Sequence, residues 1–265
     1  MAMQSSTLPK WRTIFDVPVA VLGYTEAADL VASTLEAKSF LRINFLNANN
    51  ANISANSPEL TAVLQRSVVL SDGVGLDVAS RMLYGAPFPA NLNGTDLVPR
   101  LLSNLLKPMT VGLVGSTWAV VTEAALRFAE IAPQHSFIVF SDGYFTAENQ
   151  QKVISKINAI KPDVLLVGMG TPQQELWTDE HIGASECSVV ITVGALFDFV
   201  SRRVARAPKL LRSLKLEWLF RLALEPRRLA RRYVIGNPAF ILRTLRQKAT
   251  GKAVKQNESS RTKNV

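Results

Sequence analysis

The chain has 265 residues, 48% of them hydrophobic, and one cysteine, Cys187, so it can bury a large core but cannot form an intrachain disulfide. Its formal net charge of +9 is unevenly spread, because residues 202–263 carry 18 Lys and Arg against three Glu while the first 201 residues carry a net charge of −6. This asymmetry favours an anionic partner, such as phosphate, anionic lipid or nucleic acid, although a well-solvated helical tail would have the same composition.

Short β-type runs alternate with helical patterns along the first 193 residues. A helix is predicted at 57–66, where Ser57 precedes Pro58 at the first helical position, and another ends near Tyr84. This alternation predicts an α/β fold, with a Rossmann-like parallel sheet and helices on both faces. The strands are expected at 41–46, 67–70, 109–114, 137–140, 164–167 and 189–193, and the other helices at 118–131, 148–160 and 172–181.

The sequence becomes helical and basic from about residue 203. Five apolar residues fall on one face of a first helix, three arginines follow on a second, and Asn237-Pro238 is expected to break the chain before 239–248. We therefore predict an α/β domain at 1–202, a basic helical C-terminal appendage at 203–250 and a disordered tail at 251–265. No run of about 18 uncharged apolar residues occurs, and residues 1–12 lack the apolar core of a signal peptide. The apolar face comprises Leu216, Leu219, Phe220, Ala223 and Leu224, and the arginines are Arg228, Arg231 and Arg232.

Polar residues follow several of the predicted strands, where a doubly wound sheet binds its ligands. Asp72 is either a helix N-cap or a general base, and Gln174 is either a pocket residue or an ordinary first-turn residue. The turn at Gly115 can hold a phosphate at a helix N-terminus, or it is plain strand-to-helix geometry. Asn47 and Asn49 follow the first strand of the sheet. The full Gly-x-Gly-x-x-Gly pattern is absent, which disfavours a nucleotide-binding oxidoreductase.

The order of several short motifs between about residues 40 and 233 resembles the WecG/TagA/CpsF glycosyltransferases (family 26). The resemblance implies an inverting transferase with a Rossmann-like fold, which moves a sugar from a UDP-sugar to a polyprenyl-diphosphate-linked acceptor in surface polysaccharide or exopolysaccharide biosynthesis. It also implies a peripheral enzyme at the cytoplasmic face of the bacterial inner membrane, whose appendage docks on the anionic membrane surface and completes the active site. The motifs are Ser71-Asp72-Gly73-Val74-Gly75, Gly94-Thr95-Asp96-Leu97, Asp142-Gly143-Tyr144-Phe145, Lys161-Pro162-Asp163-Val164-Leu165-Leu166-Val167-Gly168-Met169-Gly170, Pro172-Gln173-Gln174-Glu175, Phe197-Asp198-Phe199, Arg206-Ala207-Pro208, Glu217-Trp218-Leu219-Phe220-Arg221 and Glu225-Pro226-Arg227.

Matched to this family by position, Asp72 resembles the catalytic base, and Asn47 and Gln174 resemble polar pocket residues. Three arginines of the appendage resemble those that reach the diphosphate, namely Arg221, Arg228 and Arg231. Guanidinium groups suit phosphate geometry. The sequence contains no Asp-x-Asp, so we expect these arginines to neutralise the leaving group without a metal, and we expect no other cofactor.

The chain departs from the family pattern at three places. Many members carry Arg at the position of Asn91, Thr at the position of Phe45, and Gly within the segment that is here Ser201-Arg202-Arg203. The sequence around Asn47 and Asn91 is similar to that of members that add glucuronic acid in xanthan-type exopolysaccharides. Transfer of N-acetylmannosamine or N-acetylmannosaminuronic acid is the alternative.

A nucleic-acid-binding protein is the competing functional class. The basic residues, however, lie on amphipathic helices without aromatic side chains for base stacking, so no nucleic acid partner is expected. A homo-oligomer is left open.

Overall fold

The computed structural model describes residues 10–208, 210–211 and 217–251. Its centre is a six-stranded parallel sheet with the strand order β4-β3-β8-β7-β5-β6. All six predicted strands are confirmed to within two residues, since most are short apolar runs buried by helices on both faces. The strands are β3 (Leu41–Leu46), β4 (Val68–Ser71), β5 (Thr110–Gly115), β6 (Ser136–Ser141), β7 (Val164–Gly168) and β8 (Val189–Thr192).

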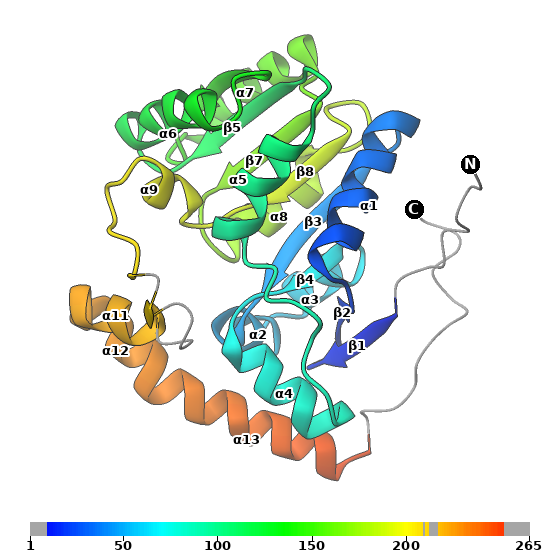
Figure 1. Cartoon of the computed structure of the whole chain (residues 1–265), viewed down its shortest axis with the longest axis vertical. Helices are drawn as coiled ribbons and strands as arrows, with labels where there is room; N and C mark the ends of the chain where they lie inside the picture. The colour runs from blue at the N-terminus through cyan, green and yellow to red at the C-terminus, as the bar shows by residue number, and fades with distance from the viewer. Residues whose placement is uncertain (1–9, 209, 212–216, 252–265) are drawn as a thin grey trace.

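Helices pack on both faces of this sheet, as predicted for a Rossmann-like fold (Figure 1). Helices α1, α5 and α6 share one apolar core with the sheet, and α7 and α8 share another on the opposite face. Helices α1, α2 and α5 were not predicted; α2 is rich in asparagine, and α5 contains both Gly94 and Pro99. The helices of the body are α1 (Tyr24–Ala37), α2 (Ala48–Ser54), α3 (Pro58–Gln65), α4 (Val74–Tyr84), α5 (Gly94–Asn104), α6 (Trp118–Ile131), α7 (Ala147–Ile160), α8 (Gln173–His181) and α9 (Leu196–Val200).

A two-stranded antiparallel hairpin, β1 (Trp11–Ile14) and β2 (Val17–Ala20), precedes the sheet and was not predicted. Its two-residue turn places both Phe15 (φ 50°) and Asp16 (φ 64°) in the left-handed region. Such turns are usually recognised from an Asn-Gly or Asp-Gly pair. Phe15-Asp16 carries no such pair, so the turn gave no local signal.

The basic C-terminal part forms helices α11 (Glu217–Leu224) and α12 (Pro226–Ala230), a π-helical turn η1 (Arg231–Ile235) and α13 (Gly236–Ala249). The chain break predicted at Asn237-Pro238 is wrong, because helical conformation continues from α12 through η1 into α13. Pro238 lies in the first turn of α13, directly after the π-helical turn, where the absence of a proline N–H is tolerated. The predicted helix residue Leu216 and most of the predicted tail lie outside the described residues.

Helix α13 packs along α2 and α4 and is built into the body (Figure 1). Phe240 is 1% exposed and lies in a core that includes residues of the hairpin and α4. Arg243 Nη1 donates to the carbonyl of Asn52 at 2.9 Å, and Gln247 Nε2 donates to the carbonyl of Thr13 at 2.9 Å. The predicted appendage, residues 203–250, therefore includes a helix that shares a core with the α/β body.

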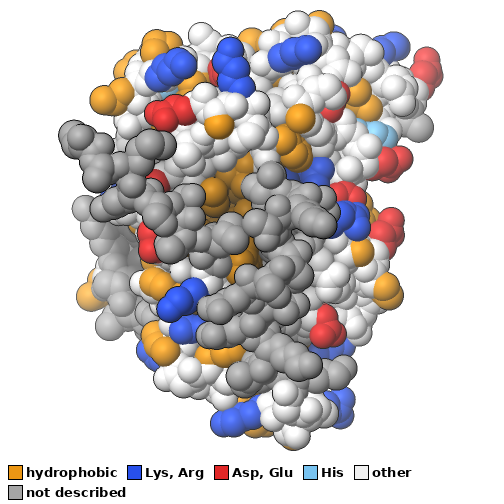
Figure 2. Space-filling model, turned by 90° about the vertical axis from the view of Figure 1, so that its right-hand side faces the viewer, with side chains coloured by type: hydrophobic (Ala, Val, Ile, Leu, Met, Phe, Trp, Pro, Cys, Tyr) orange, Lys and Arg blue, Asp and Glu red, His pale blue; other side chains and the backbone are white. Residues whose placement is uncertain are grey.

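Two further observations, one on surface charge and one on helix length, bear on function. In the face viewed in Figure 2, acidic and basic side chains are interspersed where the surface is visible, so this view presents no continuous basic field. None of the helices in the described ranges combines the length and the apolar character needed to cross a bilayer.

Candidate active site

Asp72 lies at the carboxyl end of β4, in the turn that leads into α4. Its backbone N–H donates to the carbonyl of Leu46, the last residue of the neighbouring strand β3, at 2.9 Å. Gly73 adopts φ +86° and occupies the N-cap position of α4, with no side-chain cap. The interpretation of Asp72 as the cap of this helix is therefore wrong.

Asn47 follows β3 and holds the Asp72 carboxylate from the adjacent strand end. Its Nδ2 donates to Asp72 Oδ2 at 3.1 Å, while its Oδ1 accepts from the backbone N–H of Asn50 at 3.0 Å and so caps α2. Because the Asn50 N–H needs an acceptor, the amide oxygen of Asn47 faces Asn50 and its amide nitrogen faces Asp72. Within the described part of the chain, Oδ1 of Asp72 has no hydrogen bond.

A second segment fixes the Asp72 turn from the other side. Ser71 Oγ donates to the carbonyl of Ala90 at 3.0 Å, and the Ser71 carbonyl accepts from the backbone N–H of Leu92 at 2.9 Å. Between these two residues, Asn91 Oδ1 accepts from the backbone N–H of Gly73 at 2.8 Å. The backbone on both sides of Asp72 is thus held by hydrogen bonds from a neighbouring loop.

The electrostatic surroundings of Asp72 include charges from the appendage. The carboxyl group is partly buried, and burial raises the pKa of Asp72 above its ordinary value. The hydrogen bond from Asn47 and the positive charges of Arg232 and Arg221 lower that pKa, whereas Asp96 raises it. Arginines of the appendage therefore act on the same carboxylate that the body positions.

Two arginines of the appendage have described side chains at this site. Arg232 Nη2 lies 3.4 Å from Asn47 Oδ1, and the Arg221 guanidinium lies over the ring of Phe199, 5.2 Å from its centroid. The side chains of Arg228 and Arg231 fall outside the described part, although their backbones belong to α12 and η1. Arg232 was not among the predicted site residues, but its spacing of four from Arg228 on a predicted helix was a usable signal.

A second pair of predicted residues lies after β7, where Gln174 is 4% exposed. Gln174 Oε1 accepts from the backbone N–H groups of Gly170 (3.2 Å) and Gly194 (3.1 Å), which joins the loops after β7 and β8. Gln174 Nε2 donates to Glu175 Oε1 at 2.8 Å, and Thr171 Oγ1 donates to the same oxygen at 2.9 Å. Burial raises the pKa of Glu175. Gln174 therefore supports the loops, and within the described residues both ends of its amide have hydrogen bonds.

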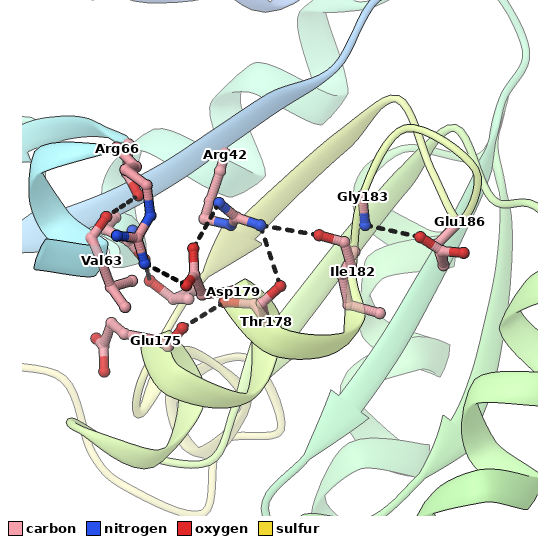
Figure 3. Close-up of polar contacts among 12 residues, drawn as sticks. Arg42, Val63, Arg66, Glu175, Thr178, Asp179, Ile182, Gly183 and Glu186 are labelled. Carbon is pink, nitrogen blue, oxygen red and sulfur yellow. Dashed lines mark hydrogen bonds and ion pairs between the residues drawn. The ribbon is translucent and has the colours of Figure 1, made fainter. Parts of the chain in front are cut away.

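The far end of α8 is fixed to β3 and α3 by an arginine cluster (Figure 3). Arg42 Nη1 contacts Asp179 Oδ1 at 3.1 Å, and its Nη2 donates to the carbonyls of Thr178 and Ile182 at 3.2 and 2.9 Å. Arg66 Nη2 contacts Asp179 Oδ2 at 2.6 Å. The cluster satisfies carbonyls at the C-terminal end of α8, so it anchors the helix that presents Gln174.

The glycine at the end of β5 is required by close backbone packing. Gly115 has φ +136°, and a Cβ there would lie 2.3 Å from the carbonyl oxygen of Gly168. The Ser116 N–H donates to that same oxygen at 2.9 Å, so it is already used. Thr117, the N-cap of α6, makes no side-chain cap and its Oγ1 has no hydrogen-bond partner. The phosphate-binding role of this turn stays a prediction, while its need for glycine has a structural cause.

Asn49 lies in the first turn of α2, beside Asn47. Its Nδ2 donates to Asn50 Oδ1 at 3.4 Å, a long hydrogen bond within the same turn. The substrate-binding role of Asn49 stays a prediction, and within the described residues no contact joins it to Asp72.

A cleft of about 580 Å³ opens between α5, α6 and α9. Its lining includes Phe199, whose ring lies under the Arg221 guanidinium, and Asp96, whose negative charge raises the pKa of Asp72. Arg206 also lines it, with Nη2 2.5 Å from Asp96 Oδ1 and Nε 3.9 Å from Glu217 Oε1 of α11. The cleft is of ligand size and lies at the contact between Arg206 and Glu217 of α11, while Asp72 itself is not part of its lining.

The sequence was compared with known families and proteins. Residues 12–254 match the model described as "Glycosyl transferase WecG/TagA/CpsF family". The chain belongs to this glycosyltransferase family. A Bacillus spizizenii protein named N-acetylglucosaminyldiphosphoundecaprenol N-acetyl-beta-D-mannosaminyltransferase is 31% identical over 72% of this chain and 73% of its own length. A Staphylococcus aureus protein of the same name is 31% identical over 65% of this chain and 67% of its own length.

The structure explains how this family member differs from the pattern at the three departures. Asn91, in the place of the usual Arg, bonds the backbone of Gly73. Phe45, in the place of Thr, is buried and packs against Gly94, where a Cβ would lie 3.1 Å from the ring. Arg202, within the segment that usually contains Gly, adopts φ +60°, which is a glycine-like conformation.

The glucuronic acid subgroup is not confirmed, because both relatives are named for N-acetylmannosaminyl transfer. Across the described residues, no cluster of three or more His, Cys, Asp or Glu side chains has the arrangement of a metal site. The charged groups that act on the Asp72 carboxyl are Arg232, Arg221 and Asp96.

Proposed function

We propose that this glycosyltransferase moves N-acetylmannosamine from its UDP-sugar to a polyprenyl-diphosphate-linked acceptor, with Asp72 as the general base. The observation that carries the proposal is the placement of Asp72. Its backbone is fixed by two loops, one of its oxygens is held by Asn47, and the other faces no described partner. A carboxylate fixed in this way at the carboxyl edge of a parallel sheet suits proton abstraction.

The proposed step is a single displacement at the anomeric carbon. Asp72 Oδ1 takes the proton of the acceptor hydroxyl, and the hydroxyl oxygen forms a bond to the anomeric carbon on the face opposite the diphosphate. The bond from that carbon to the diphosphate oxygen breaks, and UDP leaves with the electron pair. The raised pKa of Asp72 makes its carboxylate more basic than an exposed aspartate, as a general base at neutral pH requires.

The leaving diphosphate needs positive charge, and the appendage supplies it. Arg221 and Arg232 are close enough to lower the pKa of Asp72, so a diphosphate next to Asp72 would meet the same guanidinium groups. We assign Arg228 and Arg231 to the same task from the family resemblance. Because guanidinium forks bind phosphate oxygens directly, transfer is expected to continue in EDTA.

The choice of N-acetylmannosamine follows the names of the two relatives, and the donor is tested directly. The full chain is incubated with UDP-N-acetylmannosamine, UDP-N-acetylmannosaminuronic acid or UDP-glucuronic acid and a lipid-diphosphate-linked N-acetylglucosamine, and products are identified by mass. We expect the N-acetylmannosamine product. A glucuronic acid product would restore the xanthan-type interpretation, and the absence of transfer from all three donors would contradict the proposal.

Membrane docking through the appendage is part of the same proposal. Six apolar side chains of α11, η1 and α13 are between 47% and 67% exposed, and Arg246 and Lys248 lie in the last turn of α13. Apolar and basic side chains together are typical of helices at a membrane interface, where each cation near an anionic bilayer adds about 1 kcal/mol. The six are Leu219, Leu224, Val234, Ile235, Leu242 and Leu245.

Sedimentation with vesicles tests this docking. The full chain is expected to sediment with anionic vesicles at low salt and to be partly released at high salt. If it stays in the supernatant with anionic lipid at low salt, these side chains are covered by another subunit or by the body, and the membrane role is wrong. A shift with DNA but none with vesicles would favour the nucleic-acid interpretation.

A further inference from the structure

We propose that Asn91 is a specificity-determining residue, which donates a hydrogen bond from Nδ2 to a hydroxyl of the donor sugar while its Oδ1 holds the Asp72 turn. This inference rests on the proposed function, because it needs a sugar beside Asp72. It concerns a position at which this chain departs from the family pattern, so the role of Asn91 is argued from its own contacts.

The orientation of the Asn91 amide is decided by its partner. Gly73 offers a backbone N–H at 2.8 Å, and only the oxygen end of an amide can accept it. The amide nitrogen must therefore point away from the Gly73 N–H. Asn91 is exposed, and its Nδ2 has no hydrogen bond to any residue in the described ranges.

The position of Asn91 is fixed as firmly as the orientation of its side chain. Both of its neighbours in the chain bond to Ser71, through the Ala90 carbonyl at 3.0 Å and the Leu92 N–H at 2.9 Å. Ser71 and Gly73 flank Asp72, so Asn91 lies beside the proposed base and cannot move independently of it. A donor held by its scaffold in this way gives geometric selectivity without ordering cost.

The chemistry next to Asp72 indicates what this donor group meets. Arg232 Nη2 lies 3.4 Å from Asn47 Oδ1, and Asn47 holds the Asp72 carboxylate, so under the proposed function the diphosphate binds near Asp72. The sugar ring is attached directly to that diphosphate, which brings its hydroxyls toward the Asp72 turn that Asn91 contacts through the Gly73 N–H. A neutral amide N–H suits a hydroxyl or carbonyl oxygen, and a site built to bond a hydroxyl disfavours the sugar that lacks it.

The test is a cycle between protein variants and donor analogues. Dissociation constants of UDP-N-acetylmannosamine and its monodeoxy analogues are measured by calorimetry for the wild type, Asn91→Ala and Asn91→Asp. Asn91→Asp keeps an oxygen for the Gly73 N–H but has no amide donor. We expect one deoxy analogue to bind about 3- to 10-fold more weakly than the parent to the wild type, and this ratio to approach one in Asn91→Ala. In Asn91→Asp the second carboxylate oxygen accepts a hydrogen bond where the amide donates one, so the ratio for the same analogue should differ from that of Asn91→Ala.

The result that would overturn the proposal is a set of ratios that is the same in all three proteins for every analogue. Asn91 would then be only a clamp for Gly73. Thermal unfolding of the variants shows that each is folded, and binding needs no turnover. Transfer measured in the same samples reports separately on the proposed function, so intact transfer with unchanged ratios contradicts the role of Asn91 alone.

Discussion

Two strand ends of this molecule carry polar residues that look alike in the sequence, and the structure gives them different tasks. After β4, Asp72 has one carboxylate oxygen held by Asn47 and the other without a described partner. After β7, Gln174 is buried and its oxygen accepts two backbone N–H groups. The difference teaches that a polar residue at a strand end is a candidate for chemistry only when part of its hydrogen-bonding capacity remains unused.

The largest effect is expected at Asp72. Asp72→Asn keeps the side-chain shape but cannot take a proton, so transfer should fall by about 10²- to 10⁴-fold while UDP binding and the melting temperature change little. Asp163→Asn makes the same exchange at the amino end of β7, where the carboxylate only accepts from the Thr110 N–H, and should leave the rate unchanged. Near wild-type turnover by Asp72→Asn would show that Asp72 is not the general base.

At the second strand end, stability should respond more than chemistry. Gln174→Ala leaves two backbone N–H groups unpaired and should lower the free energy of unfolding by about 1–3 kcal/mol for each group that stays buried. Gln173→Ala is the matched control, because the neighbouring side chain is exposed and should change stability little. Urea denaturation measures both. If Gln174→Ala has wild-type stability but no transfer, Gln174 is a pocket residue after all.

The position of Asn47 at the first strand end also depends on contacts between α13 and α2. The effect of these contacts on transfer can be separated from their effect on overall stability. Arg243 holds the Asn52 carbonyl and donates to Asn56 Oδ1 at 2.8 Å, so it fixes the end of α2, the helix that Asn47 caps. Arg243→Ala should shift Asn47 and slow transfer by about 10-fold, since small misplacements of catalytic groups are costly. Gln247→Ala loosens α13 only at the hairpin. Equal rates of transfer for the two variants would show that α2 does not transmit this contact.

The smallest effect concerns backbone strain at Arg202. A non-glycine residue in the left-handed region costs about 1–2 kcal/mol, so Arg202→Gly should stabilise the protein by about 1 kcal/mol. The adjacent Arg203 has no positive φ, and Arg203→Gly should leave stability unchanged or lower it through the entropy of the unfolded chain. Thermal unfolding should show a higher melting temperature for Arg202→Gly and an unchanged or lower one for Arg203→Gly. A lower melting temperature for Arg202→Gly would contradict this explanation.

The sheet could be predicted from the sequence because its buried strands are short apolar runs bounded by polar turns. The hairpin could not, because its turn uses Phe15-Asp16 in place of a recognisable glycine turn. The docking of α13 was missed for a different reason. Phe240 lies beside other apolar residues, Ala239, Ile241 and Leu242, and the sequence does not show which of them is buried; the tertiary contacts with the hairpin and α4 bury Phe240.

Some residues of the candidate site could likewise be predicted from the sequence and others could not. Asp72 and Asn47 were found because both follow strands that proved to be neighbours at one edge. Gln174 was chosen by the same rule, and the rule could not show that two glycine N–H groups occupy its oxygen. The spacing of Arg232 from Arg228 marked its helix face but not its partner, because its contact with Asn47 joins segments far apart in the chain. The contact of Asn91 with Gly73 likewise depends on the tertiary fold.

The pH dependence of transfer tests most directly whether Asp72 is a base whose ionisation is set by the appendage. A base acts only when ionised, so kcat/KM should fall as the pH drops through the pKa of Asp72, which burial raises above the ordinary aspartate value. Arg232 lowers that pKa, so Arg232→Gln should move the acid limb to higher pH, whereas Arg246→Gln, which removes the same charge from the last turn of α13, should leave it in place. An acid limb that is absent from the wild type, or that stays at the same pH in Arg232→Gln, would contradict the role assigned to Asp72.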